Sequence, residues 1–283
     1  MKLNHPTAQL YVPDGTAEEE ALRRVTHLGI GAHQDDLEFM ALHGILACFQ
    51  QQDTWFGGVT CTNGAGSSRI GPYADCSDEA MIQVRREEQN LAARIGQYGC
   101  MIHLGYPSAD IQKPGQADFV EDLITILQAS RPGVVYTHNP ADKHRSHIAV
   151  LSATLRALRA LPPASRPHRV LGCEVWRNLD WLPDDAKVVL DVGGRDHLAA
   201  ALNGVFDSQI AGGKRYDLAV MGRRLANATF LDSHQVDASD QVWFAMDLTP
   251  LVQDDSMDVI DYVQHLMDRF AADVREKLEA YFP

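Results

Sequence analysis

The chain has 283 residues, of which 45% are hydrophobic and 22% charged, and its formal net charge at pH 7 is −13. This acidic balance argues against nucleic acid and against an anionic membrane as the main partner, because both are usually met by clustered lysine and arginine. A neutral or cationic small molecule fits better. The length suits a single domain over residues 1–283, with a core over about 25–192 and a C-terminal elaboration over about 193–283.

Five cysteines show no Cys-x-x-Cys spacing, and their odd number suits reduced thiols better than a disulfide framework. The sequence shows neither a signal peptide nor an apolar run of spanning length. We therefore expect a cytoplasmic protein that does not bind a membrane. The composition is also compatible with a homo-oligomer.

Strand-like and helix-like segments alternate along the first two thirds of the chain. Apolar, β-permissive runs predict strands near residues 26–32, 54–60, 100–104, 133–137, 169–176 and 187–191. Helical spacing predicts helices near residues 37–51, 77–97, 117–130 and 146–159. This βαβ rhythm predicts an α/β fold with a mostly parallel sheet flanked by helices.

The last third is less regular. Residues 193–227 are predicted to be helical with a break at Gly212-Gly213, followed by a strand over 242–246 and a closing helix over 258–281.

The first predicted strand ends in a turn that concentrates ionisable side chains. His33, Asp35, Asp36 and Glu38 lie within six residues, directly before a predicted helix. Open α/β sheets place their ligand crevices at the carboxyl ends of parallel strands. A histidine with a nearby carboxylate supplies ligands for a divalent metal such as zinc. The alternative is that the aspartates only cap the helix or lie in a solvated loop.

A second cluster follows the strand predicted near 133–137. His138, His144 and His147 crowd a polar loop before an amphipathic helix. If His144 and His147 lie on the first helical turn, their spacing of three puts both rings on one face. One ring could then bind a metal while the other touches a substrate, although the spacing does not say which. Alternatively, the loop is simply polar.

These residues resemble a known family. The turn His33–Glu38 resembles the His-Pro-Asp-Asp-x-Glu motif of the PIG-L (LmbE-like) zinc-dependent N-acetylglucosaminyl deacetylases, and Asp142–His147 resembles their later Asp-x-His-Pro-Asp-His motif. The resemblance covers about residues 25–155. Further matches follow the family's order at Thr60–Gly64, Val84–Gly96 and His103–Pro107, with a weaker echo at Gly222–Phe230.

The resemblance implies a Rossmann-like fold and a hydrolase that removes acetyl from an N-acetylated amine, such as an N-acetylglucosamine-containing small molecule. It implies that His33, Asp36 and His147 bind Zn²⁺, that Asp35 is the general base and that His144 faces the substrate carbonyl. Fe²⁺ is the other candidate metal, because it also suits His and carboxylate ligands. The alternatives are an amidase for a larger acyl group and a non-catalytic metal- or ligand-binding relative.

The chain departs from the family pattern at two places. Gln34 replaces proline, which changes the rigidity of the turn and leaves the metal ligands intact. Arg145-Ser146 replaces Pro-Asp and so removes a carboxylate that could orient an imidazole. The family also uses an arginine at the position of Arg85 to bind the substrate, and the alternative for Arg85 is an ion pair with Glu87 or Glu88.

Two other segments are candidates for the surroundings of the site. Gly64–Tyr73 is loop-like and is expected to form a mobile rim over the pocket. The cluster that contains Trp176 and Trp181 could stack on a sugar ring, although tryptophans also serve as core residues.

Overall fold

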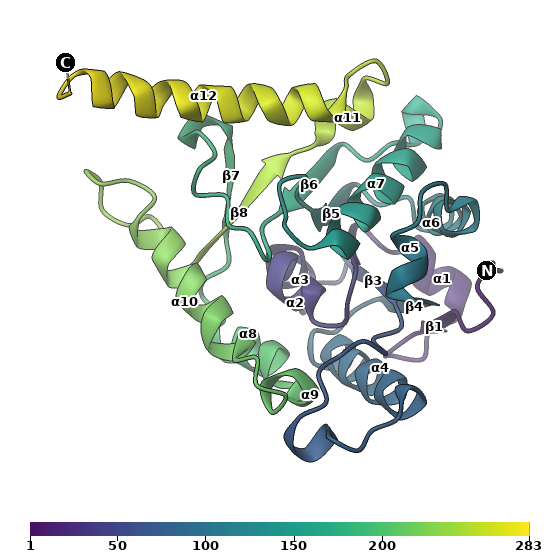
Figure 1. Cartoon of the computed structure of the whole chain (residues 1–283). Coiled ribbons are helices and arrows are strands. Elements are labelled where there is room, and N and C mark those ends of the chain that lie inside the picture. The colour runs from purple at the N-terminus through teal and green to yellow at the C-terminus, as the bar shows by residue number, and fades with distance from the viewer. Residues whose placement is uncertain (283) are drawn as a thin grey trace.

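The computed structural model describes residues 1–282, which form an eight-stranded sheet with helices on both faces (Figure 1). The strand order is β1-β4-β3-β2-β5-β6-β8-β7. The strands are β1 (Gln9–Tyr11), β2 (His27–Gly31), β3 (Phe56–Thr62), β4 (Cys100–Tyr106), β5 (Val134–His138), β6 (Arg169–Cys173), β7 (Lys187–Asp191) and β8 (Val242–Asp247).

Alternating side chains divide the strand residues between two hydrophobic cores, as a pleated sheet requires. On β8, Phe244 belongs to one core and Trp243 to the other. The first core is covered mainly by α1 (Glu18–Arg23), α5 (Ser108–Ile111), α6 (Ala117–Ser130), α7 (Arg145–Ala160), α11 (Thr249–Gln253) and α12 (Val259–Glu279). The second is covered mainly by α2 (Asp36–Met40), α3 (Leu42–Cys48), α4 (Asp78–Ile95), α8 (Asp196–Gly204) and α10 (Tyr216–Thr229). Helix α9 (Asp207–Ile210) lies against α4 and α10.

The five strands β4, β3, β2, β5 and β6 run parallel to one another, whereas β1, β7 and β8 pair antiparallel. The expected α/β fold with a mostly parallel, helix-flanked sheet is therefore confirmed. Strands β2 and β5 are neighbours, and each leads into one of the two polar turns. Because parallel neighbours end at the same edge of a sheet, the topology brings the two turns together.

All six strands predicted in the first two thirds are present, with boundaries shifted by a few residues. The single helix predicted over 37–51 is wrong in detail, because the backbone leaves helical geometry at Ala41 and separates α2 from α3. The late strand predicted over 242–246 is β8, and it inserts between β6 and β7. The C-terminal part thus completes the same sheet.

Among residues 1–282, no helix combines the length and the apolar character needed to cross a bilayer.

Candidate metal centre and catalytic pocket

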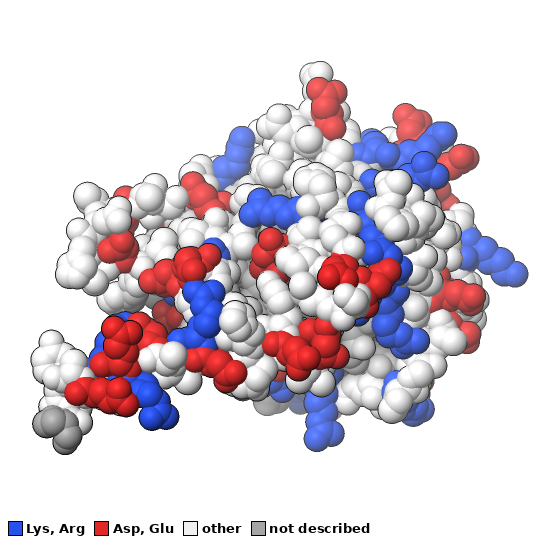
Figure 2. All heavy atoms as spheres, turned by 90° about the horizontal axis from the view of Figure 1, so that it is seen from above, with Lys and Arg blue, Asp and Glu red and all other residues white. Residues whose placement is uncertain are grey.

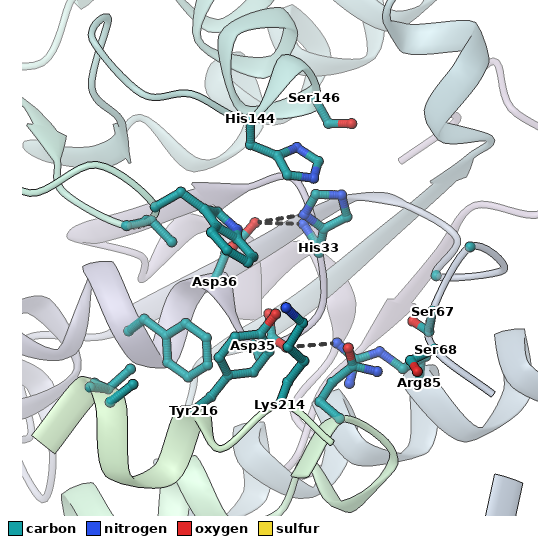
Figure 3. A pocket seen from close by; sticks show the side chains of 18 of the residues that line it. His33, Asp35, Asp36, Ser67, Ser68, Arg85, His144, Ser146, Lys214 and Tyr216 are labelled. Carbon is teal, nitrogen blue, oxygen red and sulfur yellow. Dashed lines mark hydrogen bonds and ion pairs between the residues drawn. The ribbon is translucent and has the colours of Figure 1, made fainter. Parts of the chain in front are cut away.

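Three candidate ligands from the two turns converge at the edge of the sheet. His33 follows β2, Asp36 is the first residue of α2, and His147 lies in the first turn of α7. His33 Nδ1 is 3.4 Å from Asp36 Oδ2, His147 Nε2 is 3.4 Å from Asp36 Oδ1, and the two histidine nitrogens are 3.3 Å apart. Figure 3 shows Asp36 and His33 pointing toward each other beside the open pocket.

These distances fit a metal ion. Two ligand atoms bound about 2.05 Å from a tetrahedral zinc lie about 3.3 Å from each other. The three observed separations match that value, with Asp36 presenting Oδ2 to His33 and Oδ1 to His147. Two imidazole nitrogens and a carboxylate are a donor set that divalent metals accept. The residues present therefore fit the metal that the sequence resemblance implies.

Five side chains of these turns form two overlapping groups with metal-ligand spacing, and His147 belongs to both. His33 and His144 complete one group, and Asp36 and His138 complete the other. His138 is a poor ligand through its Nε2, because this nitrogen accepts a hydrogen bond of 3.0 Å from the backbone N–H of Ala32. Its ring stacks on His147 instead, with centroids 3.8 Å apart.

His144 lines the pocket beside the metal ligands. Its ring lies edge-on to that of His33, with centroids 4.8 Å apart. Burial and the nearby His33 and His147 lower the pKa of His144 to about 4. A neutral imidazole has one N–H to donate, so His144 can offer a hydrogen bond to a substrate near pH 7.

Asp142 supplies the carboxylate that holds this loop in place. Its Oδ2 lies 3.4 Å from His147 Nδ1, on the side of the ring away from Asp36. Asp142 also accepts hydrogen bonds from the backbone N–H groups of His144 and Trp176, at 2.9 and 3.1 Å. Such a carboxylate fixes the orientation of a ligating imidazole. The loss of the family's Pro-Asp therefore leaves an orienting acid in place for His147.

Asp35 and Asp36 are adjacent and both buried, but their surroundings shift their pKa values in opposite directions. Burial raises the pKa of Asp35 to about 6, against the lowering effect of the Arg85 charge. Burial also opposes ionisation of Asp36, but its electrostatic interactions with the rings of His147, His138 and His33 more than offset it and lower the pKa of Asp36. Two acids whose pKa values differ in this way suit different tasks. Asp36 stays charged, and Asp35 can exchange a proton near neutral pH.

The backbone of Asp35 is held in an unusual conformation. Its φ of 98° lies in the left-handed region, which costs a non-glycine residue of order 1–3 kcal/mol. Its N–H donates to Gln89 Oε1 at 3.2 Å, and Arg85 donates to Asp35 Oδ2 at 3.0 Å and to the carbonyl of Gln34. Helix α4 thus holds the strained turn from the side.

Arg85 is 1% exposed and makes an ion pair of 2.8 Å with Glu88. This is one of the pairings that the sequence offered as the alternative to substrate binding. The pairing with Asp35 was not predicted. Ser208 also lies beside this pair, because its N–H and hydroxyl both donate to Glu88. Arg85 still lines the pocket, and its contact with a substrate stays a prediction.

The pocket has a volume of about 520 Å³. The loop predicted as a rim contributes Gly64, Gly66, Ser67 and Ser68, and Ser68 donates a hydrogen bond to the carbonyl of Gly212. Trp176 lies in the pocket wall, whereas Trp181 packs against the first core, and a contact of Trp176 with a sugar stays a prediction. The sequence did not identify the other wall residues from the second half, which are Val175, Gln209, Lys214, Tyr216, Ala219, Val220, Arg223 and Trp243.

Comparison with known proteins places the chain in a family. The sequence profile of the PIG-L family, described as GlcNAc-PI de-N-acetylase, matches residues 28–158, which include both metal-binding turns. YaiS of Escherichia coli (strain K12), described as an uncharacterized deacetylase, is 31% identical over 157 residues. The matched region is 53% of this chain and 77% of YaiS.

Solved structures share the fold at low identity. N,N'-diacetylchitobiose deacetylase from Pyrococcus horikoshii has a TM-score of 0.59 and 16% identity, over 77% of this chain and 83% of that one. GalB, the 4-carboxy-2-hydroxymuconate hydratase from Pseudomonas putida KT2440, has a TM-score of 0.58 and 17% identity, over 79% and 96%. These likenesses establish the fold alone. On the identity to YaiS and the profile match, the chain belongs to the PIG-L (LmbE-like) family.

Proposed function

We propose that this protein is a metal-dependent N-deacetylase that hydrolyses the amide bond of an N-acetylated amine, with an amino sugar as the substrate class. The observation that carries the proposal is the triangle of His33, Asp36 and His147, whose ligand atoms lie 3.3–3.4 Å apart. A carboxylate with a raised pKa, that of Asp35, lies directly beside it.

His33, Asp36 and His147 would hold the metal, with Zn²⁺ as the leading candidate and Fe²⁺ as the other. When bound, such an ion lowers the pKa of water and polarises a carbonyl group. Three protein ligands are the number found in catalytic zinc sites, which leave a position for water or substrate. His33 and Asp36 line the pocket, so a substrate carbonyl can reach a metal held by them.

Asp35 acts as the general base. Its carboxylate accepts a proton from the attacking water while the new C–O bond forms at the carbonyl carbon. The neutral imidazole of His144 donates a hydrogen bond to the carbonyl oxygen as negative charge develops there. The proton then passes from Asp35 to the amine nitrogen as the C–N bond breaks. The products are acetate and a free amine.

The amino-sugar substrate rests on family membership and on the pocket. YaiS is described as a deacetylase, and the Pyrococcus horikoshii protein acts on N,N'-diacetylchitobiose. A pocket of about 520 Å³ has room for more than an acetyl group, and Trp176 supplies an aromatic surface next to His144, with ring centroids 6.2 Å apart. Arg85 is the candidate for a polar contact with the sugar.

The test is acetate release from a panel of N-acetylglucosamine glycosides and N,N'-diacetylchitobiose, with N-butyryl counterparts in parallel. We expect acetate from at least one amino sugar. Faster release of butyrate would support the amidase alternative. Absence of any amide hydrolysis by the metal-loaded protein across the panel would favour the non-catalytic alternative.

The matched variant is Asp35→Asn, which keeps the shape of the side chain and removes the base. Turnover should fall by roughly two to four orders of magnitude, the usual contribution of a general base. Metal content should stay at the wild-type level, because Asp35 is not among the proposed ligands. Full turnover in Asp35→Asn would overturn its assigned role.

A further inference from the structure

A second groove lies next to the catalytic pocket, on the outer face of helix α7. Helices α5 and α6 pack against α7, and the groove lies between the start of α7 and the chain that joins α5 to α6 (Figure 1). Its volume is about 440 Å³. Gln112 lines both cavities, and its side-chain amide donates a hydrogen bond of 2.9 Å to Ser146, which lies beside His144 at the catalytic pocket (Figure 3). The two cavities are therefore neighbours with a shared boundary residue.

The groove has an apolar floor. Helix α7 turns one face toward it, with lining residues at helical spacing, and α5 and α6 add side chains that are otherwise buried in the first core. The apolar side chains that these three helices contribute are Ile111, Phe119, Val120, Ile148, Ala149 and Ala153. Ile148 is 36% exposed, although it is a large apolar residue. A concave surface of this kind suits the apolar body of a ligand.

The ionisable side chains that line this groove are all basic. They are Lys113, Lys143, Arg145 and Arg156. Lys113 pairs with Asp110 at 2.5 Å, whereas none of the other three forms an ion pair with an acid of residues 1–282. Figure 2 shows one whole face of the molecule, on which acidic and basic side chains are interspersed. In a chain with a net charge of −13, the groove is a local exception to the overall charge, which favours a neutral or cationic ligand.

Two of these cations lie where a helix disfavours positive charge. Arg145 is the first residue of α7, Lys143 lies two positions before it, and the first turn of α7 contains no acidic residue. Because the N-terminus of a helix carries a partial positive charge, cations are unfavourable there and an anion is favourable. Asp142, which precedes the helix, already contacts His147 and accepts hydrogen bonds from backbone N–H groups. An anionic ligand in the groove would offset the charges of Lys143 and Arg145.

Arg145 and Ser146 are also the residues at which this chain departs from the Pro-Asp of the family motif. Arg145 puts a cation in the groove where the motif has an uncharged residue, and Ser146 replaces an acid beside the shared boundary. Both changes make this surface less negative. Neither residue is among the proposed metal ligands, and Asp142 still orients His147. The proposed hydrolysis therefore does not account for the departure, whereas binding of an anion does.

We propose that the groove binds the distal part of the substrate, an aglycone with an apolar body and an anionic group such as a phosphate, a sulfonate or a carboxylate. The inference rests on the proposed function, because it places the acetylated amine at the metal centre and the aglycone beyond Gln112. The guanidinium of Arg145 presents paired donors to the oxygens of such a group. Lys143 and Arg156 add positive charge, and the apolar floor covers the body of the aglycone.

The experiment compares two synthetic substrates at low ionic strength, 2-naphthyl N-acetylglucosaminide and the same compound with a sulfonate on the naphthyl ring. Both have the same apolar body, so the comparison isolates the effect of the charge. We expect kcat/KM for acetate release to be about tenfold higher for the sulfonated substrate, the combined effect of a few exposed charge contacts. The preference should shrink as salt is added, because salt screens exposed charges.

The decisive variant is Arg145→Pro, which restores the residue of the family motif. Proline is favoured at the first position of a helix, and His144 already has the extended backbone that a following proline requires, with φ −89° and ψ 122°. Arg145→Pro should therefore fold and lose most of the preference, and combining it with Lys143→Ser should bring the two substrates within about twofold. The matched control, Arg94→Ser, removes an exposed arginine of α4 outside both cavities and should keep the preference.

Calorimetric titration of the metal-loaded protein with 2-naphthalenesulfonate measures the groove without catalysis. We expect the sulfonate to bind the wild type more tightly than neutral 2-naphthol does. The combined Arg145→Pro and Lys143→Ser variant should lose this difference, and Arg94→Ser should retain it.

Equal kcat/KM for the two substrates in the wild type would overturn the proposal and leave the deacetylase function intact. A preference for the sulfonated substrate that survives the combined variant would also overturn it. If neither substrate is hydrolysed, the titration decides. Sulfonate binding that the combined variant loses would support the groove as an anion site and assign the failure to the proposed function, whereas absence of binding would overturn the groove as well.

Discussion

Replacing Arg85 by methionine should cost much more stability than loss of a surface ion pair. The Arg85 side chain is 1% exposed, and its partners Asp35 and Glu88 are 8% and 9% exposed. Arg85→Met keeps much of the side-chain volume but leaves two buried carboxylates without a cation. Breaking a buried pair in this way costs about 3–5 kcal/mol, whereas an exposed pair is worth about 0–1 kcal/mol.

The loss should depend on pH. The Arg85 charge lowers the pKa of Asp35, which burial raises to about 6, so removing Arg85 raises that pKa further. If the pKa of a carboxyl group is higher in the folded than in the unfolded state, the free energy of unfolding increases as the pH falls from the higher pKa to the lower one. The difference in unfolding free energy between wild type and Arg85→Met should therefore be smaller at pH 5 than at pH 7.

Urea denaturation followed by tryptophan fluorescence at pH 7 and pH 5 measures both effects. The control is Arg85→Met combined with Glu88→Gln, which removes one of the two unpaired charges and should recover part of the lost stability. If Arg85→Met lowers the free energy of unfolding by less than about 1 kcal/mol at pH 7, the reasoning is refuted, because an exposed ion pair contributes that much. An unchanged Michaelis constant in a folded Arg85→Lys variant would favour the ion-pair role over substrate binding.

Two further predictions concern the buried His103 on β4 and Gly64 in the pocket wall. Burial lowers the pKa of His103 to about 3, whereas the pKa in the unfolded chain is near 6.5. The unfolded state therefore binds a proton first, and the free energy of unfolding should fall by about 2 kcal/mol between pH 7 and pH 5. His103→Gln should remove that part of the pH dependence in urea titrations, and an unaltered dependence would contradict it. Gly64 has φ +78°, and an added Cβ would lie 2.7 Å from Gln34 Oε1 and 2.9 Å from Arg85 Cβ. Gly64→Ala should cost about 1–2 kcal/mol and reduce turnover, whereas Gly66→Ala, with nothing within 4 Å of the added Cβ, should leave stability unchanged.

The sequence predicted the two polar turns because each is a local feature. In each case a strand-like run, a cluster of ionisable residues and an amphipathic helix follow one another directly along the chain, and periodicity detects them. Bringing His33 and His147 to 3.3 Å depends on the pairing of β2 with β5, which no local pattern encodes. Only the family resemblance joined the two turns in advance.

The parts that the sequence missed depend on tertiary contacts. Gln89 holds the N–H of Asp35 from a helix 54 positions later, and Ser208 bonds Glu88 across 120 positions. Neither residue type nor spacing points to such partners. Asp142 belonged to the recognised motif, yet its contact with His147 Nδ1 appears only once the loop is folded.

Short elements escaped prediction for a different reason. Strand β1 has three residues and helix α5 has four, which is too short for a period to register. The pocket wall from α9 and α10 was predicted only as helix, because its polar, aromatic and small apolar residues are types that also occur on ordinary helix surfaces.

The most direct test is the metal content of the wild-type protein, Asp36→Ala and His147→Ala, purified side by side without added metal and measured by elemental analysis. We predict about one zinc or iron per wild-type chain and its loss in both variants, because the two residues come from different turns but share one site. Retention of metal in either variant, or no bound metal in the wild type even after reconstitution, would contradict the proposed centre.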